Sequence, residues 1–154
     1  ATLGSLVKTP DLYTCGVDYV GVSNLFTFME TIPPYWEKYR ELLYKIWYNP
    51  NNPEEKAIMD EISPALHVDK IKNPLLVVQG ANDPRVAQAE SDQMVAALQK
   101  NGIDIEYILK TDEGHGFRNE ENQFEFYEYC ELVYKEVRQP SSLKLLFFLS
   151  SLCF

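Results

Sequence analysis

The chain has 154 residues, 45% hydrophobic and 24% charged, a composition typical of one globular domain with a real core. Its formal net charge of -9 argues against nucleic-acid binding, because neutralising phosphates requires clustered Lys and Arg. Three widely spaced Cys indicate neither a disulfide framework nor a metal knuckle, and two His argue against a His-based metal site. We therefore expect a globular protein that needs no metal or cofactor.

Chain-breaking residues and hydrophobic periodicity divide the first half into short elements. A run rich in Val and Tyr between Gly16 and Gly21 is typical of a short buried strand. Further on, apolar residues recur at helical spacing, and Asn52-Pro53 is typical of a helix start. In chain order we expect the rear of a helix at 1–7, a strand at 15–22, a loop at 23–34, and helices at 35–48 and 54–61.

The second half alternates strands and helices. Residues 75–78 are all apolar and lead into Gln79, as in a parallel strand covered on both faces. Asn101-Gly102 is a typical helix end. We expect strands at 75–79 and 103–110 and helices at 87–100 and 119–138. This order predicts an α/β fold with three parallel strands, flanking helices and right-handed crossovers. Because so thin a sheet leaves an apolar edge, self-association through that edge is also expected.

The two ends of the chain differ from the rest. Residues 139–154 form an apolar tail after a Pro- and Ser-containing break, and this tail is shorter than the roughly 20 residues that span a bilayer. We expect one domain over residues 1–138 and a tail outside the fold, with a membrane or partner anchor as the alternative. The chain starts at Ala1 without Met, so we expect the natural start to be absent and any signal peptide to be out of view. The compartment is therefore not predicted.

Two short motifs follow two of the predicted strands. Asp83 ends the first, Gly-Ala-Asn-Asp, and His115 stands in the second, Asp-Glu-Gly-His-Gly-Phe. The carboxyl ends of parallel strands meet at one edge of a sheet, and an acid followed by a His is the order of a Ser-Asp-His hydrolase triad. In that chemistry Asp83 orients the imidazole and His115 moves the proton. Taken singly, Asp83 also fits a simple turn before Pro84, and His115 a loop residue.

A nucleophile motif is missing from this sequence. The strained G-x-S-x-G turn that exposes a catalytic serine occurs nowhere in the 154 residues. Ser23 has a Gly two residues before it, but Leu25 stands where the second Gly is needed. His67, between Pro64 and a charged stretch, is interpreted as structural. We therefore expect the acid and base of a hydrolase without the group they activate, and no turnover by this chain alone.

Three stretches carry a resemblance to a known family. They are ISPA at 62–65, NPLLVVQGANDPRV at 73–86 and DEGHGF at 112–117. They resemble the prolyl oligopeptidase family of serine peptidases, in particular its acylaminoacyl- and dipeptidyl-peptidase-like members, over roughly residues 1–138. The resemblance implies the C-terminal part of an α/β-hydrolase catalytic domain, usually preceded by a β-propeller, which cleaves peptides or acyl-peptides through an acyl-enzyme.

The same resemblance assigns roles to single residues. It implies that Asp83 is the triad acid and His115 the triad base, and that Arg85 and Val86 lie near the substrate pocket, which residues 22–39 help to line. It also implies that the family's G-x-S-x-G-G motif lies just before Ala1. Two alternatives stay open: a non-catalytic fragment that associates through its sheet edge, and a fragment of an α/β-hydrolase esterase.

Overall fold

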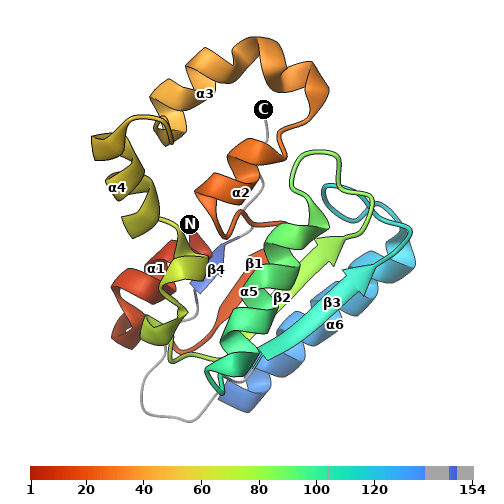
Figure 1. Ribbon diagram of the computed structural model, residues 1–154. Helices are drawn as coiled ribbons and strands as arrows, with labels where there is room; N and C mark the ends of the chain where they lie inside the picture. Colours follow the sequence, from red (N-terminus) through yellow and green to blue (C-terminus); the bar gives the residue numbers. More distant parts are fainter. Residues whose placement is uncertain (104, 138–145, 149–154) are drawn as a thin grey trace.

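The computed structural model describes residues 1–103, 105–137 and 146–148. Within them the chain forms a parallel sheet with helices on both faces, and a helical arch lies beyond the carboxyl end of β1 (Figure 1). The strands are β1 (Gly16–Tyr19), β2 (Leu75–Gly80), β3 (Ile105–Lys110) and β4 (Leu146–Phe148). The helices are α1 (Thr2–Lys8), α2 (Leu25–Glu30), α3 (Arg40–Trp47), α4 (Pro53–Glu61), α5 (Gln88–Lys100) and α6 (Glu120–Val137). The 3₁₀ turns are η1 (Pro10–Leu12), η2 (Pro34–Tyr39), η3 (Pro64–Leu66) and η4 (Val68–Lys70).

The sheet has the strand order β3-β2-β1-β4, and every neighbouring pair is parallel. Leu75 of β2 lies opposite Gly16 of β1 on one side and Ile105 of β3 on the other. These three strands therefore start level, and their carboxyl ends open onto the same edge. The three predicted strands and their parallel arrangement are confirmed, and this arrangement brings the loops after β2 and β3 side by side.

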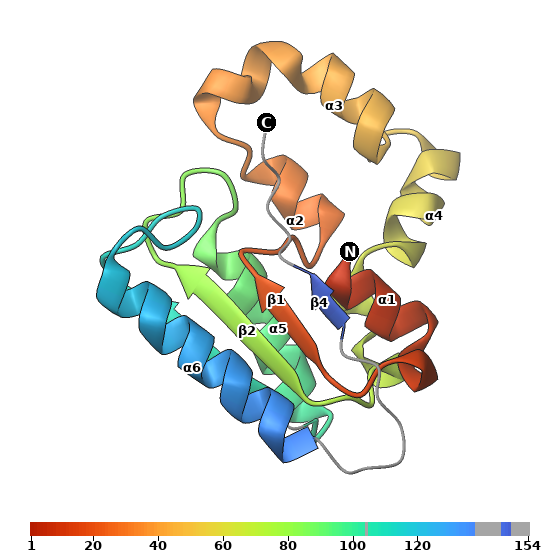
Figure 2. The same cartoon turned by 180° about the vertical axis from the view of Figure 1, so that it is seen from behind.

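Alternate residues of β2 contact opposite layers of helices. Leu75 and Val77 pack with α1 and α5 on one face, whereas Leu76 and Val78 pack with α6 on the other. Figure 2 shows α6 crossing the face opposite to α5. All four side chains are at most 2% exposed. This double burial is the physical reason for the unbroken apolar run in the sequence, since a strand side chain points to one face or the other with period two.

The helix boundaries follow local capping chemistry. The side chain of Asn52 accepts a hydrogen bond from the N–H of Glu54, as predicted for the start of α4, and Gly102 follows α5 with a φ of 70°. The expected loop at 23–34 is wrong in its middle, where α2 forms. There the Asn24 side chain accepts from the N–H of Phe26 at 3.0 Å and caps a helix of only 6 residues, which is too short to show a clear period.

The expected helix at 35–48 is divided in the structure. Its first part is the 3₁₀ turn η2, which starts at Pro34, and the α-helix α3 begins only at Arg40. Together with α2 and α4 these elements form the arch, whose interior is a separate apolar cluster centred on Phe28, Leu43 and Met59. The arch thus has its own small core beside the carboxyl end of β1.

The apolar tail contributes to the sheet. We expected residues 139–154 to lie outside the fold, but Leu146–Phe148 pair in parallel with β1 as strand β4, and this expectation is wrong at those residues. The physical reason is that the edge of β1 presents unpaired backbone N–H and C=O groups, which an extended apolar segment can satisfy. The rest of the tail lies outside the described residues. In the part of the chain that the structure describes, no helix has the length and apolarity needed to cross a membrane.

Candidate active site

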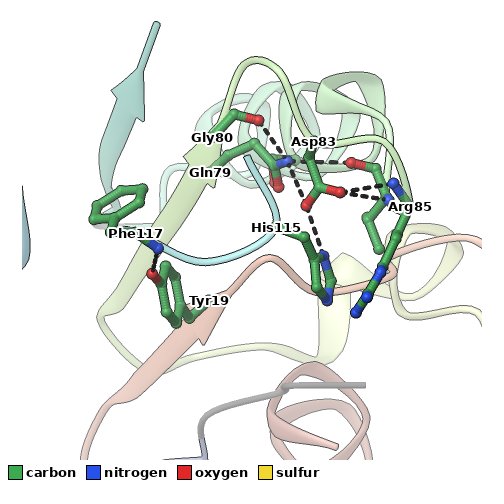
Figure 3. Close-up of polar contacts among 9 residues, drawn as sticks. Tyr19, Gln79, Gly80, Asp83, Arg85, His115 and Phe117 are labelled. Carbon is green, nitrogen blue, oxygen red and sulfur yellow. Dashed lines mark hydrogen bonds and ion pairs between the residues drawn. The ribbon is translucent and has the colours of Figure 1, made fainter. Parts of the chain in front are cut away.

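The acid and the histidine of the two predicted motifs lie next to each other (Figure 3). Asp83 is in the loop after β2 and His115 in the loop after β3. Nδ1 of His115 lies 2.7 Å from Oδ2 of Asp83. The side chain of Asp83 is fully buried and that of His115 is 9% exposed. The structure therefore brings together the two residues that the order of motifs singled out, and their catalytic roles stay a prediction.

Asp83 is oriented through its other oxygen. Oδ1 accepts hydrogen bonds from the backbone N–H groups of Arg85 at 2.8 Å and Val86 at 2.9 Å. The Gln79 amide donates to the carbonyls of Gly80 and Val86 and lies 3.5 Å from Oδ2. All these groups donate, which suits an ionised carboxylate that can only accept. The Asp-Pro turn and the predicted acid are thus one structure, in which the turn holds the carboxylate toward the imidazole.

The second ring nitrogen of His115 is buried and has no hydrogen-bond partner among the described residues. Since a carboxylate at Asp83 only accepts, Nδ1 is the atom that donates, and in the neutral imidazole Nε2 then carries the lone pair. In a neutral imidazole held in this tautomer, Nε2 is the atom that can take a proton from a nucleophile. A buried polar atom without a partner is uncommon in folded proteins.

Arg85 and Val86 take different places. The Arg85 side chain lies beside His115 in Figure 3 and lines the hollow around it. Val86 was expected near the substrate pocket, but its side chain is 1% exposed and packs in the core of the arch. A β-branched apolar side chain gains more from that core than from the cleft wall. Val86 therefore contributes to the site through its backbone N–H and C=O groups, as described for Asp83 and Gln79.

Two hollows meet at Arg85. One, of about 710 Å³, surrounds His115 and is lined also by Tyr19, Val20 and Asn119. Val20 has a φ of 52°, a strained conformation for a β-branched residue. The other, of about 420 Å³, is formed by the arch and is largely aromatic. Its lining residues are Tyr35, Trp36, Tyr39, Leu42, Leu43, Ile46, Trp47 and Arg85. Arg85 thus lines both the cleft at the imidazole and the apolar hollow of the arch.

The two loops approach so closely that one position requires glycine. A Cβ built on Gly80 would stand 2.2 Å from the carbonyl oxygen of Gly114, far inside contact distance. The backbone N–H of Asn82 also donates to the carbonyl of Glu113 at 2.9 Å. The absent side chain of Gly80 is therefore what lets the His115 loop cross over the end of β2 and reach Asp83.

Tyr19, at the end of β1, supports the His115 loop from below and was missed in the sequence. Its hydroxyl accepts a hydrogen bond from the backbone N–H of Phe117. Its ring stacks on Phe126 with centroids 4.9 Å apart and meets Phe117 edge to face at 5.2 Å. Burial raises the pKa of the Tyr19 phenol, so it stays protonated at neutral pH. No local sequence signal marked this role, because Tyr19 lies inside the strand expected at 15–22 and becomes a strand end only in the structure.

The remaining candidates are engaged elsewhere. Ser23 is 1% exposed, and its hydroxyl donates to the carbonyl of Glu90 at 2.7 Å, so it is not placed as a nucleophile. The His67 ring lies 2.9 Å from the carbonyl oxygen of Asp60, in agreement with a structural role. Burial raises the pKa of the Cys15 thiol, and raises that of Cys130 to about 11. Among the described residues, no cluster of His, Cys, Asp and Glu could hold a metal ion.

The family of this chain follows from its sequence relatives. The profile of the prolyl oligopeptidase family matches residues 1–133. The chain belongs to the prolyl oligopeptidase family. It is 52% identical over 126 residues to dipeptidyl aminopeptidase BIII of Pseudoxanthomonas mexicana and 44% identical over 131 residues to dipeptidyl peptidase family member 6 of Caenorhabditis elegans. These alignments cover 82% and 84% of the chain but 18% of each relative.

A solved structure supports the fold. The chain matches a puromycin-hydrolyzing peptidase of Mycobacterium tuberculosis with a TM-score of 0.78 and 25% sequence identity, over 94% of this chain and 21% of that one. The prolyl oligopeptidase resemblance and the α/β-hydrolase fold inferred from three short motifs are both confirmed. The chain is thus an α/β unit with the length of about a fifth of such peptidases.

Proposed function

We propose that this chain is part of the catalytic domain of a serine peptidase, in which Asp83 and His115 act as the acid and the base of the triad. The observation that carries this proposal is the buried, unpartnered Nε2 of His115 opposite an Nδ1 held by Asp83. A hydroxyl placed at Nε2 would satisfy the orphaned atom and would be activated by it. The family to which the chain belongs supports the serine assignment.

In the proposed reaction, Nε2 of His115 takes the serine proton as the serine oxygen attacks the scissile carbonyl carbon. The Asp83 carboxylate stabilises the resulting imidazolium and keeps the ring in one orientation. The proton then passes from Nε2 to the leaving amine, and the acyl-enzyme is hydrolysed by water with the same base. The substrate class we propose is a peptide or an acyl-peptide, in line with the dipeptidyl aminopeptidase and acylamino-acid-releasing enzyme among the relatives.

The nucleophile is proposed to lie in a G-x-S-x-G-G turn before Ala1 in a longer protein. No side chain of the described residues hydrogen-bonds to Nε2, so we expect this chain alone to be inactive. Removing the nucleophile from a triad leaves only the contribution of the oxyanion hole and of substrate binding.

Fluorophosphonate labelling read by intact mass tests the proposal. We expect no adduct on this chain and a stoichiometric adduct on a longer protein that includes the upstream turn. A His115→Gln variant of the longer protein should lose most of the labelling rate. An adduct on this chain, or a longer protein that stays unlabelled, would contradict the proposal. Comparing peptide anilides with simple esters on the longer protein separates the peptidase from the esterase alternative.

A second candidate function is association through the sheet edge. The observation that favours it is the parallel pairing of Leu146–Phe148 with this edge of β1. In the full chain Leu146–Phe148 occupy this edge, so association requires a partner strand to replace them. A chain ending at residue 138 has the edge open, and we expect it to form oligomers at lower concentration than the full chain. Light scattering of both chains over a concentration series tests this proposal. If both chains stay monomeric at every concentration, this function is ruled out.

A further inference from the structure

The loop that carries His115 is held by a buried acid two residues away. Glu113 is 3% exposed, and its carboxylate accepts three hydrogen bonds. Oε2 accepts the backbone N–H of Arg118 at 2.9 Å, and Oε1 accepts the backbone N–H of Asn119 at 2.9 Å. The side-chain amide of Asn122 also donates to Oε1, at 2.9 Å. Glu113 therefore joins the start of the loop to its far end and to the first turn of α6.

The backbone of the same residue reaches the other loop of the site. The carbonyl of Glu113 accepts the N–H of Asn82, next to Asp83, at 2.9 Å, and its N–H donates to the carbonyl of Lys110 at the end of β3. One residue thus contacts both strand-end loops. The backbone hydrogen bonds of Glu113 hold the chain before His115, and its side-chain hydrogen bonds hold the chain after His115. The direction of the imidazole therefore depends on both sets of hydrogen bonds.

The Glu113 carboxylate is suited to this task by its charge. Burial acts to raise its pKa, but the hydrogen bonds from Asn122, Arg118 and Asn119 outweigh burial and keep the pKa below its usual value. The group is therefore ionised and offers only acceptors to three donors. Hydrogen bonds to a charged group contribute more than neutral ones, and a broken bond would leave buried N–H groups without partners.

We propose that Glu113 is a positioning residue for the base, which holds the loop so that Nδ1 of His115 stays on Asp83 and Nε2 stays directed into the hollow. The link to catalysis rests on the proposed function of His115. The geometric part of the proposal, that the His115–Asp83 contact depends on Glu113, does not rest on the proposed function.

The isosteric variant Glu113→Gln tests the geometric part. Arg118 and Asn119 donate to different oxygens, so an amide in either orientation turns its NH₂ group toward one of these two N–H groups. One hydrogen bond is lost when the NH₂ group takes the place of Oε2, and two are lost when it takes the place of Oε1; contacts between donors replace them. The loop should then no longer be held at its far end, while the size of the side chain is unchanged.

Asp112→Asn is the matched control. Asp112 is the adjacent acid, is exposed, and accepts from the side chains of Asn119 and Asn122, yet no bond from the backbone of residues 118 and 119 reaches it. An effect that arises only from negative charge near the start of α6 should appear in both variants. An effect of holding the loop should appear in Glu113→Gln alone.

The readout is the imidazole state of His115 by nitrogen-detected NMR on this chain, with His67 as an internal reference. We expect the wild type and Asp112→Asn to show the Nδ1–H tautomer with a protected proton. In Glu113→Gln the ratio of Nδ1–H to Nε2–H tautomers should fall roughly tenfold and the proton should exchange with water. Unchanged His115 signals in Glu113→Gln, or an equal change in both variants, would overturn the proposal.

Two further measurements keep the test decisive. If Glu113→Gln does not fold, Glu113→Asp retains the charge but is too short to reach both N–H groups, and the same loss of the His115 signature is expected. In a longer, active protein Glu113→Gln should lower kcat on the order of 100-fold with little change in KM. If the longer wild-type protein is inactive, the proposed function fails while the NMR result still decides the role of Glu113.

Discussion

The two strand-end loops and the helical arch are built in opposite ways. The loops are short, and backbone N–H groups, two buried acids and a tyrosine hydroxyl hold them against the sheet. The arch is a chain of small helices around one apolar cluster, and it leaves four large apolar side chains about half exposed. These are Tyr35, Tyr39, Leu42 and Ile46. Geometry at the acid and base is therefore complete within the described residues, whereas the arch keeps an apolar surface open beside Arg85.

The difference teaches where precision is needed. The proton transfer proposed for His115 would depend on its placement to a fraction of an ångström, and its loop is held by directional hydrogen bonds. An apolar hollow depends on shape and burial, which are not directional. Variants that disturb each region should therefore act by different mechanisms.

The largest effect is expected from Gly80→Ala. The new Cβ would overlap the carbonyl oxygen of Gly114, and a backbone atom cannot move aside as a flexible side chain can. We expect a loss of more than about 3 kcal/mol in the free energy of unfolding, measured by urea denaturation. Gly4→Ala is the control, because its Cβ meets nothing within 4 Å and a helix position gains from alanine by roughly 0.5–1 kcal/mol. Equal stability of the two variants would show that the close approach of the loops does not constrain the fold.

Two adjacent leucines test the arch. Leu43 is 8% exposed and packs in the cluster of the arch, whereas Leu42 is 52% exposed. We expect Leu43→Ala to lower the free energy of unfolding by about 2–3 kcal/mol and Leu42→Ala by less than about 0.5 kcal/mol. The His115 tautomer should be unchanged in Leu42→Ala, because Val86, which links the cluster of the arch to Asp83, keeps its packing there. A large loss in Leu42→Ala would mean that the exposed face is buried in solution, as in an oligomer.

The smallest effect concerns Asp18, on β1 where the two regions meet. Asp18 is 3% exposed; its pKa is raised to about 6, mainly by burial and against the opposing influence of the chain's amino terminus. The folded state thus holds a proton more tightly than the unfolded state, in which the pKa is about 3.9. Stability from this group is present at low pH and is lost as the pH rises from about 4 through 6.

Asp18→Asn should remove this pH dependence and stabilise the chain by about 1–2 kcal/mol at pH 7.5, with no gain at pH 4. Denaturation midpoints of both chains between these pH values provide the measurement. Glu61→Gln, an exposed acid at the end of α4, is the control and should follow the wild type. An advantage of Asp18→Asn over the wild type that does not grow between pH 4 and 6 would contradict the raised pKa of Asp18.

Much of the fold was predictable because it follows from local chemistry. The apolar run at 75–79 indicated a strand covered on both faces, Asn52 and Gly102 marked helix ends, and the order of Asp83 and His115 indicated their meeting at one sheet edge. Each of these inferences needs only neighbouring residues and a rule of backbone geometry. The short helix α2 and the 3₁₀ turn before α3 were missed because elements of about one or two turns carry too few residues to show a period.

What the sequence by itself determined is the α/β order of elements, the family and the meeting of Asp83 with His115, since these are encoded in short motifs and in periodicity. Only the tertiary structure decided the burial of Val86, the pairing of Leu146–Phe148 with β1, and the supports from Tyr19 and Glu113. The physical reason is distance along the chain. Tyr19 and Phe117 are 98 residues apart, and no local pattern marks which hydroxyl meets which N–H when distant segments pack.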